Sequence, residues 1–215
     1  MSTTQDRRSV ILDNAAHLFA TKGIGATTVR EIADSVGILS GSLYHHFKSK
    51  DEMVNAIISD YLTDLTYRYA KVLASEESPA TQLRELVTSS LANIEAHPHA
   101  TEIYQNSSNY LPKIDGYEHI RESATSIQRA WIQVLEAGIA RGDFRNDIPV
   151  RVLHGMLRDS LWLSVRWFKP TPSYSRAAFA ADFVSVYLDG FSPATERGRS
   201  APGASTSGVR HDTPN

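Results

Sequence analysis

Hydrogen-bonding side chains are concentrated between residues 39 and 50 of this chain. The candidates for contact with a partner are Leu39, Ser40, Gly41, Ser42, Tyr44, His45, His46 and Lys50. The phenol, imidazole and ammonium groups supply hydrogen-bond donors, and the small residues let the backbone approach a partner closely. Such donors suit the base edges and phosphates of a DNA groove, where the leucine adds an apolar contact for a thymine methyl group. This segment therefore predicts recognition of double-stranded DNA rather than catalysis.

The residues around this segment predict two short helices separated by a tight turn. Thr28 and Glu31 have the spacing of a capping box, in which each side chain accepts a hydrogen bond from the other residue's backbone amide. Gly37 ends that helix, and Leu43 and Phe47, four residues apart, share the inward face of a second helix about two turns long. With a preceding helix over residues 7–22, this pattern is a helix-turn-helix whose second helix reads the DNA.

The segments ATTVREIA, SGSLYHHF and KSKDEM resemble the DNA-binding domain of the TetR family of repressors. The resemblance implies that phosphate groups are held by Thr27, Thr28 and Lys50, with Arg30 as a further candidate. Two alternatives stay open. The ring of Tyr44, or one of the two histidines, can have a mainly structural role. The three helices can also form a plain core with only weak, non-specific DNA affinity, about 10⁻⁴–10⁻⁶ M.

Apolar spacing predicts helix through nearly all of the remaining chain, and no strand pattern competes with it. The expected helices cover residues 50–74, 80–96, 100–110, 117–141, 150–168 and 175–191, separated by proline and glycine residues. The predicted fold is all-α, with a three-helix DNA-binding domain at residues 1–50 and a larger helical ligand-binding and dimerisation domain at residues 51–191. Residues 192–215 contain one sizeable aliphatic residue, Val209, and predict a disordered tail.

A second group of chemically suited side chains lies in the segment VLHGMLRDSLWLSVRWFKP. Arg158, Trp162 and Arg166 follow one another at spacings of four, so two guanidinium groups flank an indole on one helix face. A solvated stripe of arginines is one interpretation, but a solvated face gains little from a tryptophan. A pocket for an apolar body that carries a carboxylate or phosphate would use all three side chains.

This segment, together with ILSGSLYHHFKSKDEMV and EIYQ, resembles a narrower group within the family. These are actinobacterial repressors of cholesterol C and D ring degradation, which respond to a CoA thioester. The resemblance implies that Arg158 and Trp162 bind the effector, and Arg166 is a reasonable addition from the same helix. The further candidates are Tyr104, Gln105 and Trp131. The resemblance covers most of residues 8–190, but the chain departs from it at residues 106–116 and in the tail. Another acyl-CoA, an aromatic acid or a drug therefore stays open as the effector.

Composition excludes several other classes of protein. The 215 residues include no cysteine, which rules out disulfides, thiolate zinc sites and cysteine catalysis. Neither a secretory signal nor an apolar run of about twenty residues occurs, so we expect a cytoplasmic protein without a membrane segment. The net charge of −2 is unevenly distributed, because residues 1–50 carry six basic and four acidic residues, a net +2, which leaves −4 for the rest. The distribution favours phosphate contact through one end of the molecule.

Metal binding and enzymatic activity are also disfavoured. Adjacent residues on a helix, such as His45 and His46, point about 100° apart, and His97 and His99 flank a proline, which is typical of a surface turn. No nucleophile elbow or acid/base pair is recognisable, so we expect no cofactor, no metal and no enzymatic reaction. A sensor of cationic drugs would need carboxylates that face aromatic rings, whereas the best candidate face carries arginines.

The expected mechanism is that of a homodimeric repressor. Two copies would pair through their last two long helices in a four-helix interface. The second helix of each helix-turn-helix, here called the reader, would then face one of two successive major grooves of a palindromic operator. The half-sites would then lie about one helical turn apart, roughly 34–36 Å. An effector in the helical core would favour a conformation with altered reader separation and so weaken DNA binding.

Overall fold

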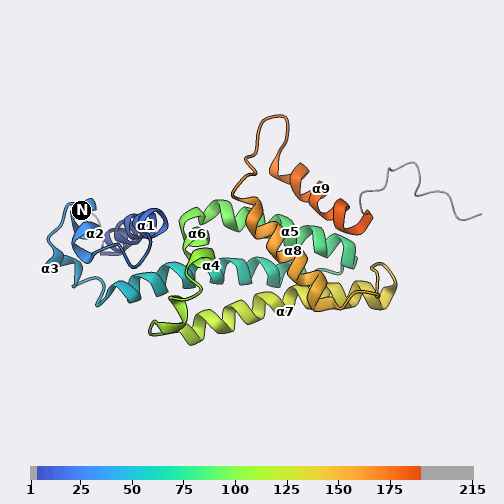
Figure 1. The fold of residues 1–215 in the computed structure, drawn as a ribbon, viewed down its shortest axis with the longest axis horizontal. Helices are drawn as coiled ribbons and strands as arrows, with labels where there is room; N and C mark the ends of the chain where they lie inside the picture. Colours follow the sequence, from blue (N-terminus) through green and yellow to red (C-terminus); the bar gives the residue numbers. More distant parts are fainter. Residues whose placement is uncertain (1–3, 190–215) are drawn as a thin grey trace, which may run out of the picture.

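The computed structural model describes residues 4–189, and all regular elements within that range are helices, as the sequence predicts. Figure 1 shows their arrangement along one elongated molecule. The helices are α1 (Thr4–Lys22), α2 (Val29–Ser35), α3 (Ser40–Leu43), α4 (Lys50–Leu73), α5 (Pro79–Ala96), α6 (Pro98–Asn106), the 3₁₀ helix η1 (Leu111–Lys113), α7 (Tyr117–Arg141), α8 (Val150–Ser164) and α9 (Arg176–Asp189). The predicted disordered tail, residues 192–215, lies outside the described residues.

Helices α1, α2 and α3 form a small unit at one end of the molecule, coloured blue in Figure 1. The predicted capping box is present at the start of α2, where the Glu31 amide donates to Thr28 Oγ1 and the Thr28 amide donates to Glu31 Oε2. Gly37, two residues after the last residue of α2, has a φ of 69°, a left-handed conformation that glycine adopts without strain and that keeps the helix from continuing. Leu43 and Phe47 are buried in the core of this unit, as expected.

Helix α4 leaves this unit and runs through the rest of the molecule, where α5 and α7 pack along it (Figure 1). Its buried residues divide between two apolar clusters. Met53 to Leu62 join the core of α1–α3, and Leu65, Tyr69 and Val72 join a second core with α5, α7, α8 and α9. In the second core Trp131 Nε1 donates to the Tyr69 hydroxyl at 2.9 Å. One continuous helix therefore contributes to both cores.

Several helix boundaries differ from the expected ones, most clearly in α6, which ends at Asn106 rather than at residue 110, and in α8. Helix α6 begins at Pro98 rather than at residue 100, because proline is tolerated in a first helical turn, where its missing N–H has no partner to bond. Helix α8 ends at Ser164 rather than at residue 168. The amides of residues 166–168 bond back to the carbonyls of Leu163 and Ser164 in a tight turn, and Gln105 Nε2 donates to the Trp162 carbonyl. A side chain from α6 thus caps the end of α8.

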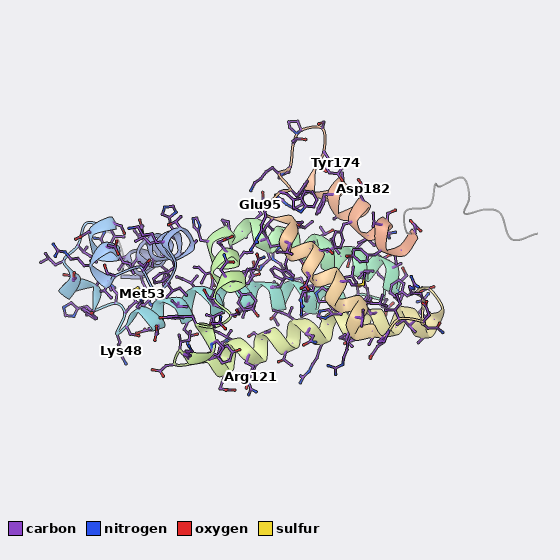
Figure 2. The ribbon with its side chains drawn as sticks, viewed as in Figure 1. Lys48, Met53, Glu95, Arg121, Tyr174 and Asp182 are labelled. Atoms are coloured by element: carbon purple, nitrogen blue, oxygen red, sulfur yellow. The ribbon has the colours of Figure 1, made fainter. Side chains whose placement is uncertain are left out.

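The α8–α9 connection projects from the body of the molecule (Figure 1). Figure 2 shows Tyr174 and Asp182 close together beside α9, and the Tyr174 hydroxyl donates to Asp182 Oδ2 at 2.7 Å. This contact fixes the connection against α9. No helix among residues 4–189 combines the length and the apolar character that a membrane crossing requires.

Candidate functional site

The turn and helix that carry the predicted reader present their polar residues to solvent. Leu39, which precedes α3, is 79% exposed, and Tyr44 is 53% exposed. His45 is exposed and His46 is half-buried, while Leu43 and Phe47 face the core. The exposed ring of Tyr44 favours contact with a partner over packing on α1. Helix α3 is shorter than expected, four residues, and hydrogen-bonded turns continue it to Phe47.

The four residues predicted to hold phosphate differ in what their side chains do. Thr28 and Arg30 are exposed at the start of α2. Thr27 is buried and its hydroxyl donates to the Gly23 carbonyl at 2.9 Å, so its side chain holds the α1–α2 loop. Lys50 Nζ donates to the carbonyls of Ile24 and Thr27 at 2.7 and 3.1 Å, which leaves one of its three N–H groups for a phosphate.

The capping carboxylate of Glu31 also joins α2 to α1, because Lys22 Nζ lies 2.8 Å from Glu31 Oε1. The hydrogen bond from Lys22, followed by those from Thr28, lowers the pKa of Glu31 to about 2, against an ordinary value of 4.5. A carboxyl whose folded pKa is depressed stabilises the fold above its unfolded pKa, and that contribution is lost as the pH falls toward the folded pKa.

We expect Glu31→Gln to lower the free energy of unfolding at pH 7, since it removes the ion pair and weakens the cap. The difference in unfolding free energy between wild type and Glu31→Gln should shrink as the pH falls below about 4.5, where Glu31 begins to protonate in the unfolded chain. Urea unfolding between pH 7 and pH 4, with Glu118→Gln on α7 as a control, measures this. A gap that stayed constant with pH would contradict the assigned pKa.

A cavity of about 190 Å³ lies between α4, α6, α7 and α8. Its lining consists of Leu62, Leu65, Tyr104, Ala124, Ile127, Gln128, Trp131, His154, Arg158 and Trp162. Four of the six predicted effector-binding residues are therefore in the lining: Tyr104, Trp131, Arg158 and Trp162. Larger surface hollows lie elsewhere, such as one of about 670 Å³ around Arg68 and Lys71. The smaller cavity is the better candidate, because aromatic rings and a guanidinium converge on it.

The two remaining predicted residues lie beside the cavity. Gln105 caps the Trp162 carbonyl, and Arg166 donates to Asn106 Oδ1 at 3.3 Å. Both side chains thus connect the end of α8 to α6. Arg158 is exposed at the cavity rim, where its Nε donates to Asp159 Oδ1 at 2.8 Å.

The cavity favours an uncharged histidine and an uncharged phenol. Burial, and then the positive charge of Arg158, lowers the pKa of His154 below 6.5. Burial also raises the pKa of Tyr104. Arg158 is therefore the positive charge among the described lining residues at neutral pH, and an anionic group of a ligand would meet it.

His154 belongs to the cavity lining, although the sequence analysis did not assign it to a site. Its spacing of four residues from Arg158 was the available signal. The apolar lining residues from α4 and α7, such as Leu62 and Ile127, gave no local signal, because only the packing of distant helices brings them to α8.

The helix-turn-helix and the helical bundle match two families of known proteins. Residues 11–57 match the family described as "Bacterial regulatory proteins, tetR family", and residues 76–191 match the "Tetracyclin repressor-like, C-terminal domain". The chain belongs to the TetR family. TetR regulators bind operator DNA, act as dimers and respond to small-molecule effectors.

Among TetR-family proteins the chain is similar to repressors called KstR2. It is 44% identical to "HTH-type transcriptional repressor KstR2" of Rhodococcus jostii over 184 residues, which is 86% of this chain and 90% of that protein. The Mycolicibacterium smegmatis KstR2 is 40% identical over 190 residues, or 88% and 92% of the two chains. The solved "ketosteroid transcriptional regulator KstR2 of Mycobacterium tuberculosis" superposes with a TM-score of 0.79 at 36% identity, covering 88% and 96%. The chain is therefore a TetR-type transcriptional repressor homologous to KstR2, and not an enzyme.

Proposed function

We propose that this repressor binds a palindromic operator as a homodimer and is released by a steroid-derived acyl-CoA thioester bound at the α8 cavity. The observation that carries the effector class is the placement of the Trp162 indole and the Arg158 guanidinium on one cavity. An indole contributes apolar area, and a guanidinium binds phosphate or carboxylate. The relative from Mycobacterium tuberculosis, named a ketosteroid regulator, supports the steroid part of the proposal.

The size of the cavity suggests how an effector would act. At about 190 Å³ it is smaller than ordinary small-molecule sites, which occupy roughly 300–1,000 Å³. An apolar ring system would have to widen it by moving α4, α6, α7 or α8 apart, and the rest of a thioester would extend past the exposed Arg158. Such a ligand binds a wider conformation better and shifts the population toward it.

The charge of the cavity lining distinguishes the proposed effector from other classes of ligand. Within the described residues no carboxylate lines the cavity, and Asp159 at its rim is already paired with Arg158, so a cationic drug would find no lining carboxylate to meet its charge. Another acyl-CoA or an aromatic acid would satisfy the same guanidinium, and is the alternative effector.

The proposed reader comprises two sets of residues. Bases would be contacted by Leu39, Ser40, Gly41, Ser42, Tyr44, His45 and His46, and phosphates by Thr27, Thr28, Arg30 and Lys50. Most residues of the base-contacting set are exposed, with Ser40 and His46 half-buried, which supports this assignment. In the phosphate-contacting set, the hydroxyls of Thr27 and Thr28 already bond within the fold, and two of the three N–H groups of Lys50 do so. Figure 2 shows Lys48 at the same end of the molecule, where it adds positive charge.

The proposed dimer interface is the outer face of α8 and α9. Val152, Met156 and Leu163 are large apolar residues that lie exposed on one face of α8, and Val186 lies exposed on α9. The Tyr187 hydroxyl donates to the Met156 carbonyl at 3.0 Å and ties the two helices together. Exposed large apolar residues on one helix face are typical of an interface.

The effector assignment is tested by Arg158→Met paired with Tyr44→Ala, each bound to the chain's own upstream DNA at fixed salt. Arg158→Met should keep wild-type operator affinity but need about tenfold or more thioester for release, because a charge-assisted contact is lost. Tyr44→Ala should bind thioester normally and lose about 10- to 100-fold in operator affinity.

Wild-type protein should be released by a steroid-derived CoA thioester and not by free CoA. Specific DNA binding that no thioester alters would retain the repressor and remove the proposed effector. An Arg158→Met protein that lost DNA and thioester binding together, through unfolding, would leave the cavity assignment without support.

A further inference from the structure

The first turn of α4 contacts three different parts of the molecule through three consecutive side chains. Lys50 donates to the carbonyls of Ile24 and Thr27, in the loop that precedes α2. Glu52 accepts from the Lys48 amide at 2.7 Å and pairs with Arg8 of α1 at 3.6 Å. Lys50 and Glu52 therefore fix the start of α4 to the α1–α2 loop, to α1 and to Lys48, which follows the reader.

Between them, Asp51 points to a different partner. Its Oδ1 accepts a hydrogen bond from the hydroxyl of Tyr110, which lies in the segment between α6 and α7. Burial, followed by the contact with Asp51, raises the pKa of Tyr110 to about 12, so the phenol stays protonated and remains the donor. The hydrogen bond therefore joins a neutral donor to a carboxylate across 59 residues of chain.

One turn further along α4, a second contact holds the same segment. Asn55 Nδ2 donates to the Asp115 carbonyl at 2.9 Å, and Ser59 Oγ donates to Asn55 Oδ1 at 2.9 Å, which orients the amide. Gly116 has a φ of 82°, and a Cβ on it would lie 2.1 Å from Asn55 Nδ2. The close fit shows that residues 110–116 are seated on α4 at two points.

The other end of this segment begins at the cavity. Tyr104 of α6 lines the cavity, and the next residue, Gln105, caps the Trp162 carbonyl of α8. Asn106, the last residue of α6, accepts from Arg166. Only three residues then separate Asn106 from Tyr110, which contacts Asp51.

We propose that the Tyr110–Asp51 hydrogen bond is the contact through which the effector cavity is coupled to the reader, with the Asn55–Asp115 contact as its support. The inference rests on the proposed function, because it takes the α8 cavity as the effector site. A ligand that widens the cavity displaces α6 and the segment after it. Through Tyr110 that displacement reaches the first turn of α4, whose neighbouring side chains Lys50 and Glu52 hold α1, the α1–α2 loop and the residue that follows the reader.

The competing route is the direct packing of α6 on α1, which includes the edge-to-face contact of His17 with His99 at 5.1 Å between ring centroids. If that packing carried the coupling, loss of the Tyr110 hydroxyl would leave the response to effector unchanged. Removing the hydroxyl oxygen of Tyr110 therefore distinguishes the two routes experimentally.

The deciding variant is Tyr110→Phe, which keeps the ring and removes the donor. Its matched control is Tyr67→Phe, since Tyr67 lies further along α4, is 60% exposed and takes no part in this contact. We expect Tyr110→Phe to bind a steroid-derived CoA thioester with wild-type affinity, as measured by tryptophan fluorescence. Its operator affinity without effector should stay within a few-fold of wild type, while the effector-induced loss of affinity shrinks by about tenfold. Asp51→Asn, which removes the charge that strengthens the bond, should shift the response in the same direction.

A second readout needs no effector. Because coupling is reciprocal, binding of the chain's own upstream DNA should change hydrogen exchange at the amides of residues 107–116 in wild type and in Tyr67→Phe, but not in Tyr110→Phe. If no thioester releases wild-type protein, the proposed effector is wrong and this readout alone decides the coupling contact. Equal exchange responses in wild type and Tyr110→Phe, or no response in wild type, would overturn the proposal.

Discussion

Met156→Glu is expected to convert the repressor dimer into monomers and to lower operator affinity by about 10²- to 10⁴-fold. Met156 is 52% exposed at the centre of the apolar face of α8, and a carboxylate there would be desolvated without a partner when two copies pair. A monomer engages one half-site at a time, so the effective-concentration advantage of the second half-site is lost.

Sedimentation measures the oligomeric state of Met156→Glu, and operator binding at fixed salt measures the affinity. Tyr67→Glu is the matched control, because it places the same charge on an exposed apolar residue of α4 outside the proposed interface. The control should remain dimeric with wild-type affinity. A Met156→Glu protein that stayed dimeric with full operator affinity would place the interface elsewhere.

The second large effect is expected from Phe47→Ala, which should cost about 3–5 kcal/mol of unfolding free energy and abolish specific operator binding. Phe47 is 1% exposed, and the Arg8 guanidinium lies 4.1 Å from its ring centroid. The truncation removes ring contacts and the cation–π interaction together and leaves a cavity beneath the reader.

The dimer should survive this change, because Phe47 belongs to the cluster around α1–α4 and the proposed interface lies on the second cluster. Phe47→Leu, which keeps most of the apolar volume, should retain most of the stability and some DNA binding. Denaturant unfolding and sedimentation test both statements. A loss below about 1 kcal/mol in Phe47→Ala would contradict the assigned role of the ring.

Local features of the fold were predictable because their causes are local. The capping box of Thr28 and Glu31, the end of α2 at Gly37 and the inward positions of Leu43 and Phe47 all depend on residues a few positions apart. The end of α8, which differed from expectation, depends on a distant partner. Helix α8 ends where a glutamine from α6, 57 residues away, reaches the Trp162 carbonyl.

The sites were predictable to the extent that each lies on one helix. The spacing of Arg158 and Trp162 assigned them to one face, and both line the cavity. Lys50 shows where such reasoning ends, because its ammonium bonds to the Ile24 carbonyl, 26 residues away, and no periodicity signals that contact. The roles of these residues toward DNA and effector stay predictions until the variants are measured.

The 24 residues of α4, about 36 Å of unbroken helix, limit where the chain can be cut to isolate its DNA-binding unit. Met53, Val54, Ile57 and Ile58 complete the core around the reader, so a fragment that stopped at residue 50 would leave that core open to water. The reader is therefore not a portable module. A chimaera that transfers this DNA specificity to another sensor domain must include the first half of α4. Its sensor domain must also supply contacts equivalent to those that residues 110–116 make with α4 here.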